Sequence, residues 1–306
     1  MIPCNITVLG NMYVETLVKT PKFCSDKEVK AESFDLNCSG FGFLQSTAIA
    51  KLGANVKVLG CVGNDLYGKV ILSCLKKENV VSDGVRLEGS PTGSMVNINC
   101  EVQNYSVYYG GANEKISSEY IESSVRVLRN TDFLVLGNKI DPVLLSTLSN
   151  LCKNCKTKII YSAFNPEKLS KNAVRTADIN VLGSKCVTYL TDIDITDNIS
   201  GKKAAEKLKT MAKGTIVIYS EDCGGIYDGG SAVKIMEPYK SSFKCGGDVK
   251  FMGFTAAYVT ALSKYAINDD AVDFALYTAE CSAVKGQTPY MNELREKVFK
   301  DKVERK

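Results

Sequence analysis

The sequence contains no histidine among its 306 residues. This absence excludes Ser-His-Asp and Cys-His catalysis, the zincin motifs and haem ligation by histidine, because each of these needs an imidazole. Any acid–base chemistry must therefore use Asp, Glu, Lys, Tyr or Cys side chains. Long apolar runs are lacking as well. No run approaches the ~20 residues that a membrane-spanning helix needs, so we expect no membrane segment.

The charge balance shows little excess of either sign. The chain has 38 basic and 34 acidic residues, a formal net charge of +4. A nucleic-acid-binding domain usually carries a basic patch or a higher isoelectric point, so we expect no nucleic-acid partner. The first residues, Met1-Ile-Pro-Cys-Asn5, lack the basic and apolar regions of a secretory signal. We therefore expect a cytoplasmic protein.

Cysteine is plentiful, with 12 residues, but its distribution does not indicate disulfides. The cysteines are spread over a long chain without a secretory signal, which favours reduced and mostly buried thiols. Cys152 and Cys155 form a CxxC, yet no second pair stands at zinc-ribbon spacing and no histidine can complete a site. We interpret this motif as a coincidence, and we assign no residue as a metal ligand.

Most of the chain alternates between strand and helix patterns. Short apolar runs that end at glycine or at polar turns predict buried strands, and the segments between them have the character of helices. This order is typical of an α/β protein with a mainly parallel sheet that helices cover on both faces. The expected strands are 5–10, 55–61, 132–137, 157–161, 178–182 and 215–219. The helices expected between the later strands are at about 141–153, 166–174 and 201–212.

Two further stretches, approximately 12–36 and 94–110, alternate polar and apolar residues instead. This period predicts strands of a small exposed sheet. No low-complexity linker or internal repeat interrupts the chain. We therefore predict a single domain over residues 1–306, with the small sheet forming a lid.

Five glycine-containing motifs stand out along the chain. They are Ser39-Gly-Phe-Gly42, Gly63-x-Asp65-x-x-Gly68, Ser90-Pro-Thr-Gly-Ser94, Gly110-Gly-Ala-Asn113 and Cys245-Gly-Gly-Asp248. In their order and spacing these motifs resemble the ribokinase-like (PfkB) family of sugar and nucleoside kinases. The resemblance covers nearly the whole chain, and both adenosine kinases and ribokinases are possible nearer relatives. It implies a three-layer αβα fold with a mainly parallel central sheet and a small β-sheet lid.

The resemblance implies a catalytic base at Asp248, because a kinase of small molecules needs a group that takes the proton of the attacking hydroxyl. Cys245, Gly246 and Gly247 would form the anion hole with the backbone N–H groups at the start of an apolar helix. Asp248 could alternatively serve as a cap of that helix, since Asp is favoured at this end. The pattern alone favours the cap, and the resemblance favours the base.

On the substrate side the resemblance implies contacts from Asn11, Glu15, Gly40 and Gly42, with Gln45 as a possible further contact. The two glycines would form a tight turn where substrate hydroxyls meet the backbone. Glu15 stands where the family commonly has an Asp that holds sugar hydroxyls. Each assignment has a plain structural alternative: a loop that leads into a helix for the glycines, and a surface carboxylate for Glu15.

The nucleotide side would be formed by Ser184, Ser220 and Glu221. Here the chain departs from the family pattern. Residues 183–187 contain no carboxylate to support Mg²⁺, and Lys185 places a positive charge there. Glu221 would repel the ATP phosphates, and Lys250 would lower the pKa of a base at Asp248.

Further departures affect the anion hole and the substrate side. Cys245 replaces the first glycine of the anion hole, and Leu44 replaces the asparagine on the substrate side. These departures favour an impaired or inactive kinase that still binds a nucleoside, a nucleotide or a protein partner. The alternative is an active kinase that uses ATP and Mg²⁺ to phosphorylate a hydroxymethyl group of a nucleoside or sugar, with Asp248 as general base. The small sheet could form a homodimer interface or simply cover the ligand.

Overall fold

The computed structural model describes residues 4–21, 27–101, 103–137, 140–228, 232–241, 246–264, 266–295 and 303–305. Over these residues the main sheet has nine strands. The strand order is β13 (Val233–Met236), β12 (Gly224–Asp228), β11 (Thr215–Ser220), β10 (Ile179–Gly183), β9 (Lys158–Ala163), β8 (Phe133–Gly137), β1 (Asn5–Leu9), β4 (Asn55–Gly63) and β5 (Val85–Glu88). Neighbouring strands from β11 to β5 pair in parallel, and β12 and β13 pair in antiparallel fashion at one edge.

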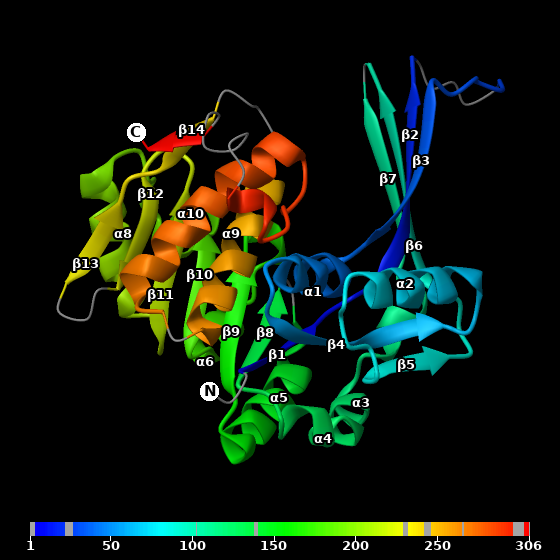
Figure 1. Ribbon diagram of the computed structural model, residues 1–306, viewed down its shortest axis with the longest axis horizontal. Coiled ribbons are helices and arrows are strands. Elements are labelled where there is room, and N and C mark those ends of the chain that lie inside the picture. Colours follow the sequence, from blue (N-terminus) through cyan, green and yellow to red (C-terminus); the bar gives the residue numbers. More distant parts are fainter. Residues whose placement is uncertain are drawn as a thin grey trace.

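Helices cover both faces of this sheet, so the predicted α/β architecture is confirmed (Figure 1). Successive strand residues point to opposite faces. In β10, Val181 belongs to one core and Leu182 to the other, and both are fully buried. The first core is covered by α1 (Phe41–Lys51), α2 (Leu66–Lys77), α9 (Gly247–Ser263) and α10 (Asn268–Lys285). The second is covered by α3 (Ser118–Ser123), α4 (Val125–Leu128), α5 (Pro142–Cys155), α6 (Lys171–Thr176), α7 (Ser184–Thr191) and α8 (Asn198–Lys209).

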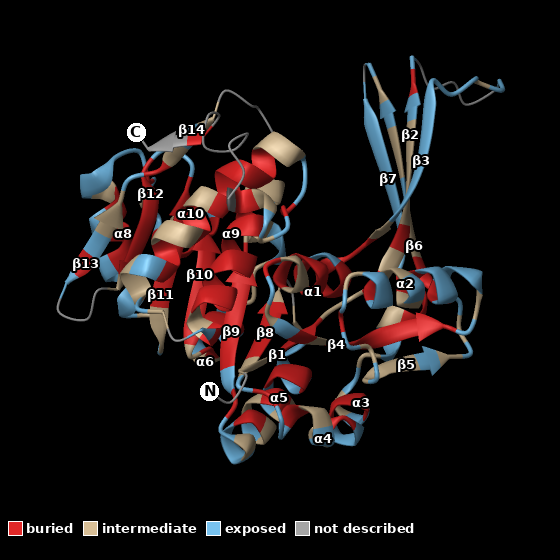
Figure 2. Ribbon diagram, viewed as in Figure 1, coloured by how far each residue is buried: buried red, intermediate tan, exposed pale blue. Residues whose placement is uncertain are grey.

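A second sheet stands away from the main body, and much of its surface is exposed (Figures 1 and 2). Its order is β3 (Ser33–Ser39), β2 (Tyr13–Thr20), β6 (Gly93–Cys100) and β7 (Asn104–Tyr109). β2 pairs in parallel with β6, and the two outer pairs are antiparallel. These strands overlap the two stretches, 12–36 and 94–110, whose alternating pattern predicted a small sheet, although β3 extends beyond residue 36 to Ser39 and β6 begins at Gly93. A short pair, β14 (Tyr239–Ser241) with β15 (Val303–Arg305), packs against α10.

The Gly63–Gly68 motif joins α2 to the start of β6. Asp65 caps α2 by accepting a hydrogen bond from the Gly68 N–H at 2.8 Å. The same carboxylate accepts from the Thr92 N–H at 2.7 Å and from the Thr92 hydroxyl at 2.6 Å. Burial raises the pKa of the Asp65 carboxyl, but these hydrogen bonds outweigh burial and hold the pKa below its usual range. A Cβ on Gly68 would lie 2.1 Å from the Gly63 carbonyl oxygen, so the turn requires glycine there.

Asn113 fixes the base of the second sheet. Its side-chain oxygen accepts from the Met12 N–H at 2.8 Å, and its amide nitrogen donates to the Met12 carbonyl at 2.9 Å and the Gly110 carbonyl at 3.0 Å. One side chain therefore links the segment before β2 with the segment after β7. A Cβ on Gly93 would lie 2.4 Å from the Asn113 amide nitrogen, so this contact needs the bare backbone.

Among the described residues, no helix combines the length and apolar character needed to cross a membrane.

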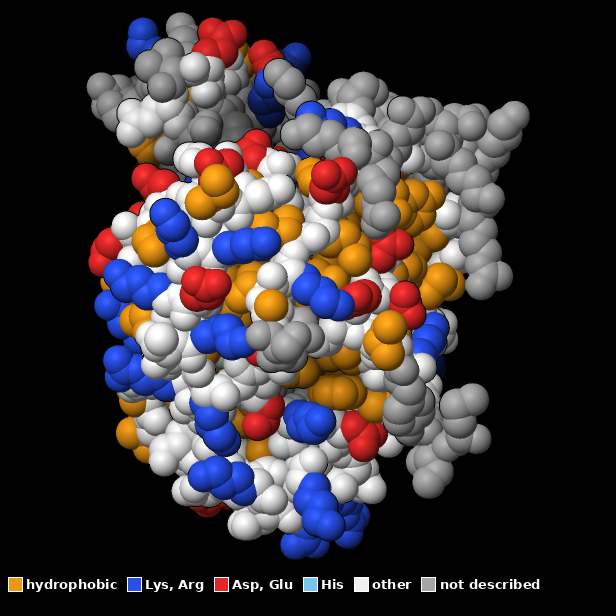
Figure 3. Space-filling view, turned by 90° about the vertical axis from the view of Figure 1, so that its left-hand side faces the viewer, with side chains coloured by type: hydrophobic (Ala, Val, Ile, Leu, Met, Phe, Trp, Pro, Cys, Tyr) orange, Lys and Arg blue, Asp and Glu red, His pale blue; other side chains and the backbone are white. Residues whose placement is uncertain are grey.

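The edge of the molecule at β13 and α8 shows Lys and Arg side chains scattered among acidic, apolar and uncharged ones (Figure 3).

Candidate active site

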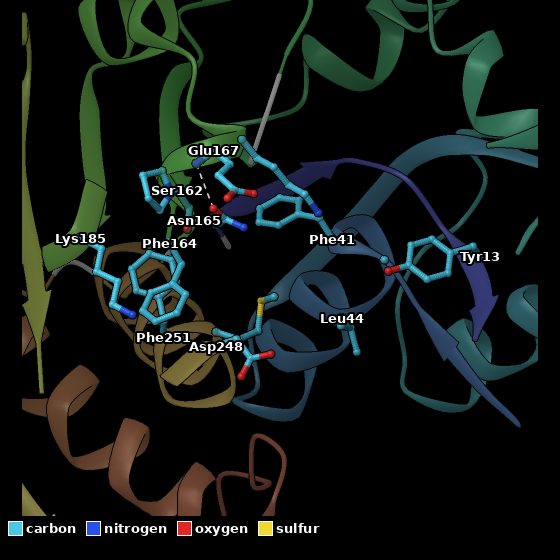
Figure 4. A pocket seen from close by; sticks show the side chains of 14 residues that line it. Tyr13, Phe41, Leu44, Ser162, Phe164, Asn165, Glu167, Lys185, Asp248 and Phe251 are labelled. Carbon is cyan, nitrogen blue, oxygen red and sulfur yellow. Dashed lines mark hydrogen bonds between the residues drawn. The ribbon is translucent and has the colours of Figure 1, made fainter. Parts of the chain in front are cut away.

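Asp248 lies in the first turn of α9 and lines a cavity of about 620 Å³ (Figure 4). This central cavity lies beside the carboxyl end of β9 and the beginnings of α1, α7 and α9. Gly246 is the N-cap residue of α9, and no side-chain cap bond forms there. Asp248 is therefore not the helix cap that the sequence pattern suggested. Its Oδ1 accepts a hydrogen bond from the Val249 N–H at 3.0 Å.

Two other cavities share residues with the central one. A second cavity, of about 370 Å³, shares Leu44, Asp248 and Met252 with it and extends to Glu15. A third cavity, of about 680 Å³, shares Tyr13, Phe41 and Lys168 with it and extends under the second sheet to Asn11, Asn113, Glu114 and Asp141. Asp248 thus lies where the first two cavities meet.

The start of α9 has the geometry of an anion site. Among the described residues, none accepts a hydrogen bond from the N–H groups of Gly247 and Asp248, as expected for the first turn of a helix. A Cβ on Gly247 would lie 2.6 Å from Glu221 Oε1 and 2.8 Å from Phe164 Cζ. Glycine at this position therefore keeps the backbone accessible. Cys245, the first residue of the predicted anion hole, lies outside the described residues.

Lys250 does not pair with Asp248. Its ammonium nitrogen lies 2.8 Å from Glu280 Oε1 and 3.7 Å from Glu221 Oε2. The Lys250 and Glu280 side chains are 12% and 9% exposed, so the pair is nearly buried, and Glu280 Oε2 accepts from the Ser241 hydroxyl at 2.9 Å. The prediction that Lys250 acts on the base therefore needs correction, because its ion-pair partners are Glu280 and Glu221.

Gly40 and Gly42 have different tasks. Gly40 lines the central cavity with φ +98°, a conformation that favours glycine, and a Cβ there would lie 2.4 Å from the Asn11 carbonyl oxygen. Gly42 packs α1 onto the end of β1: its N–H donates to the Asn11 carbonyl at 2.9 Å, and a Cβ would lie 2.5 Å from the Gly10 carbonyl. The Asn11 side chain accepts from the Phe41 N–H at 3.1 Å. Asn11 and Gly42 thus orient the start of α1, and Asn11 also borders the third cavity.

Glu15 and Gln45 are placed differently. Glu15 lines the second cavity and accepts from the Asn97 amide at 2.6 Å, so its carboxylate is held in place. Gln45 is fully buried and lines none of the three cavities. Its amide has no hydrogen-bond partner among the described residues. The structure therefore does not bring Gln45 to the site with the others.

On the predicted nucleotide side, Ser184 and Ser220 line none of the three cavities. The Ser220 hydroxyl accepts from the Cys223 N–H at 3.2 Å, which commits it to a turn after β11. Glu221 lies beside Gly247, as the anion-site geometry above describes. Lys185, on the first turn of α7, lines the central cavity and extends along Phe164 (Figure 4).

The aromatic walls of the site were not predicted from the sequence. Phe164 and Phe251 pack at 5.1 Å between ring centroids on one side of the central cavity, and Tyr13 and Phe41 lie on the other side (Figure 4). A Cβ on Gly137 would lie 2.2 Å from the Phe41 ring, so that glycine makes room for it. The signal that could have found Phe164 is its place directly after the strand at 157–161, because the carboxyl ends of parallel strands border ligand sites.

The residues present suit Mg²⁺ only in part. Mg²⁺ is usually held by one or two carboxylates together with substrate phosphates and water. Asp248 and Glu167 line the central cavity, and Glu221 lies against the anion site. Among the residues that the structure describes, no group of three or more Cys, Asp and Glu could hold a metal ion by itself. Any Mg²⁺ would therefore depend on nucleotide phosphates and water for most of its ligands.

Comparison with known proteins agrees with this fold. Residues 5–293 match the pfkB family carbohydrate kinases. The ribokinase of Haemophilus influenzae is 23% identical over 290 residues, which covers 92% of this chain and 92% of that protein. The ribokinase of Bacillus subtilis is 30% identical over 166 residues, covering 53% and 55%.

Solved structures show the same architecture. The structure of Arabidopsis thaliana ribokinase complexed with ribose and ATP matches with a TM-score of 0.84 at 19% identity, covering 96% of this chain and 98% of that chain. The ribokinase of Thermotoga maritima matches with a TM-score of 0.79 at 20% identity, covering 97% and 99%. The chain belongs to the pfkB family of carbohydrate kinases, and the predicted ribokinase-like αβα fold is confirmed.

Proposed function

We propose that the protein is an ATP-dependent kinase that phosphorylates an alcohol group of a sugar or nucleoside. The observation that carries this proposal is the position of Asp248, which lies where two cavities meet, beside N–H groups that have no acceptor among the described residues. Catalysis by the family's chemistry needs this combination of a base and anion donors in one place. Lys250, the cation two residues from the proposed base, forms its ion pair with Glu280.

In the proposed reaction the hydroxyl oxygen of the acceptor attacks the γ-phosphorus of ATP, and the Asp248 carboxylate takes the proton of that hydroxyl. The bond from that phosphorus to the ADP oxygen breaks, and the electron pair leaves with ADP. The N–H groups of Gly247 and Asp248 face the charge that develops on the phosphates. Mg²⁺ would be held mainly by the nucleotide phosphates, with Glu167 as a carboxylate of the central cavity, and it would supply positive charge there. Lys185 is placed to contribute a further positive charge from α7.

The walls of the central cavity suit an acceptor with both polar and apolar surfaces. Glu15 supplies a fixed carboxylate in the second cavity, and Gly40 exposes backbone at the central one. Tyr13, Phe41 and Leu44 supply apolar surface. Aromatic rings pack well against the C–H faces of a sugar or against a base, so this lining supports a sugar or nucleoside as acceptor.

We also propose that the second sheet is a lid and that a second copy of the chain covers its outer face. Tyr13, Met95 and Tyr108 border the third cavity, whereas the alternate residues face outward. Leu36, Val96 and Val107 lie on that outer face, 49%, 37% and 67% exposed. Contiguous exposed apolar residues mark an interaction surface. The alternative is a lid that covers the ligand without forming a dimer.

A second candidate function is binding without turnover. Leu44, which lines two cavities, offers no hydrogen bond to an acceptor hydroxyl, and Glu221 brings negative charge to the anion site. Residues 183–187 supply no carboxylate for Mg²⁺. Such a protein would hold a nucleotide or nucleoside, or a protein partner, in a kinase-shaped cavity.

One experiment separates the two functions. Purified protein is incubated with ATP and Mg²⁺ and a panel of sugars and nucleosides, and the phosphorylated product is identified by mass spectrometry. Product formed from one acceptor class supports the kinase and names its substrate. A folded protein that binds ATP and forms no product across the panel would leave the binding function in its place.

A further inference from the structure

Four polar side chains form a cluster beside α9, and none of them lines the three cavities: Lys250, Glu280, Glu221 and Ser241. Lys250 is 2.8 Å from Glu280 and 3.7 Å from Glu221, and Ser241 donates to the second oxygen of Glu280 at 2.9 Å. Glu280 is 9% exposed, whereas Glu221 is 48% exposed. One nearly buried ammonium group is therefore shared between a buried carboxylate and a carboxylate at the surface.

The Glu221 end of this cluster reaches the anion site. Glu221 Oε1 lies 2.6 Å from the position that a Cβ on Gly247 would take. Glu221 Oε1 is therefore next to the backbone at the start of α9. Because like charges repel, an uncompensated Glu221 would oppose nucleotide phosphates that bind there. The Tyr219 phenol reports the same surroundings: burial raises its pKa, and the charges of Glu280 and Glu221 raise it further. Among the described residues, Lys250 is the cation that pairs with Glu221.

We propose that Lys250 is a positioning residue for the nucleoside triphosphate: it neutralises Glu221 and holds that carboxylate to the side of the anion site. The phosphates then approach the Gly247 and Asp248 N–H groups without facing a free negative charge. Lys250 and Glu221 both depart from the family pattern. In this proposal the positive charge of Lys250 offsets the repulsion that Glu221 would exert on the phosphates. This inference rests on the proposed function in one respect, namely that nucleotide phosphates bind at the start of α9.

Lys250 also has a structural task that any test must separate from the proposed one. Removing the ammonium leaves Glu280 as a nearly buried carboxylate without its cation, and this destabilises a fold. Loss of nucleotide binding in Lys250→Met alone could therefore follow from poor folding. The two partners of Lys250 make the separation possible, because each can be neutralised by itself.

The experiment measures the affinity for ATP with Mg²⁺ by calorimetry, and the thermal unfolding temperature, in five variants. These are Lys250→Met, Glu221→Gln, the double variants K250M/E221Q and K250M/E280Q, and the control Lys234→Met. Lys234 forms an exposed ion pair with Asp269 at 2.8 Å, near the far edge of the main sheet. The control therefore removes a paired lysine without touching the anion site.

We expect Lys250→Met to weaken ATP binding by about tenfold or more, because an unscreened carboxylate then faces the phosphates. K250M/E221Q should recover the affinity to within about threefold of the wild type while its unfolding temperature stays low. K250M/E280Q should show the reverse, a recovered unfolding temperature with weak ATP binding. Glu221→Gln alone should bind ATP at least as tightly as the wild type, and Lys234→Met should bind it unchanged.

The proposal is overturned if K250M/E221Q binds ATP as weakly as Lys250→Met, or if K250M/E280Q recovers both properties, because Lys250 would then act through stability alone. Binding is measured without turnover, so the kinase proposal is tested separately. A wild type that binds ATP and phosphorylates nothing overturns the kinase proposal but leaves this test decisive. A wild type that binds no ATP contradicts both proposals.

Discussion

Asp248 and Lys250 are two residues apart on α9, and their side chains serve different surroundings. Asp248 lines the central cavity, and Lys250 pairs with Glu280 at 2.8 Å on another side of the helix. Consecutive residues of an α-helix are about 100° apart around its axis, so two residues separated by two positions point in directions about 200° apart. Lys250 is therefore close to Asp248 in the sequence, but its side chain does not point to the same surroundings.

The Asp65 cap should contribute strongly to stability. In Asp65→Asn one carboxylate oxygen becomes an NH₂ group. If Oδ1 keeps the Gly68 N–H and the Thr92 hydroxyl, the bond that Oδ2 accepts from the Thr92 N–H is lost, together with the charge that strengthens the other two. We expect a loss of about 1.5–3 kcal/mol of unfolding free energy, measured by urea denaturation. Asp83→Asn is the matched control, because Asp83 is 64% exposed and 3.8 Å from Lys57. A control as damaging as Asp65→Asn would contradict the assigned role.

The same carboxyl predicts the direction of a pH dependence. The pKa of Asp65 is lower in the folded state than in the unfolded chain, so its contribution is complete above the unfolded pKa of about 4. That contribution is lost as the pH falls through the folded pKa. We expect the difference in stability between the wild type and Asp65→Asn to shrink as the pH falls below about 4. A difference that is constant from pH 7 down to acid unfolding would show that the carboxylate charge does not matter.

Gly42 should tolerate no larger residue. A Cβ there would lie 2.5 Å from the Gly10 carbonyl oxygen, so α1 must move away from β1 in Gly42→Ala. We expect a loss of about 1–3 kcal/mol in unfolding free energy, typical of overpacking. Gly89→Ala is the matched control, since a Cβ on Gly89 meets nothing within 4 Å. Equal stability of the two variants would contradict the close packing at Gly42.

The sequence predicted the layers well because periodicity reports burial. The expected strand 132–137 corresponds to β8 at Phe133–Gly137, since its apolar run is buried on both faces. The helix expected at 166–174 is wrong in one respect: Ser170 caps a new helix, α6, by accepting from the Ala173 N–H, and only a short 3₁₀ turn, Pro166–Lys168, precedes it. Helix α7 was missed because its N-cap, Gly183, provides no side-chain signal.

The site was harder to predict, because neighbouring positions on a helix face different surroundings. Leu44 and Gln45 are adjacent on α1, yet Leu44 lines two cavities and Gln45 is fully buried. Gln45 therefore does not replace the family's asparagine, whose position Leu44 occupies. The role of Ser220 could not be predicted from the sequence either, because the hydrogen bond that its hydroxyl accepts from the Cys223 N–H depends on the turn after β11.

The outer face of the lid should control oligomeric state. Val107 is 67% exposed on that face, so Val107→Glu places charge in the proposed interface. We expect the wild type to be a dimer and Val107→Glu a monomer in analytical ultracentrifugation, because a buried unpaired charge strongly opposes association. Asn99→Glu is the matched control on the other face of β6, and it should remain dimeric. A monomeric wild type would remove the dimer and leave the lid as a cover.

Leu44 should limit the affinity for the acceptor. In Leu44→Asn an amide at the meeting of two cavities can bond an acceptor hydroxyl. One such hydrogen bond is worth about 0.5–1.5 kcal/mol, so we expect kcat/KM for the acceptor to rise about 2- to 10-fold while KM for ATP is unchanged. Leu44→Ala separates the amide from the added space. An equal rise in Leu44→Ala would assign the effect to room instead of hydrogen bonding.

The most direct test of the kinase proposal compares the wild type with Asp248→Asn, in the steady-state rate of ADP formation with the best acceptor and in the calorimetric affinity for ATP. The variant keeps the shape of the side chain and removes the base. We predict a fall in kcat of about 10²- to 10⁴-fold with ATP affinity changed by less than about threefold. Unchanged kcat in Asp248→Asn would contradict the role of Asp248 as the catalytic base.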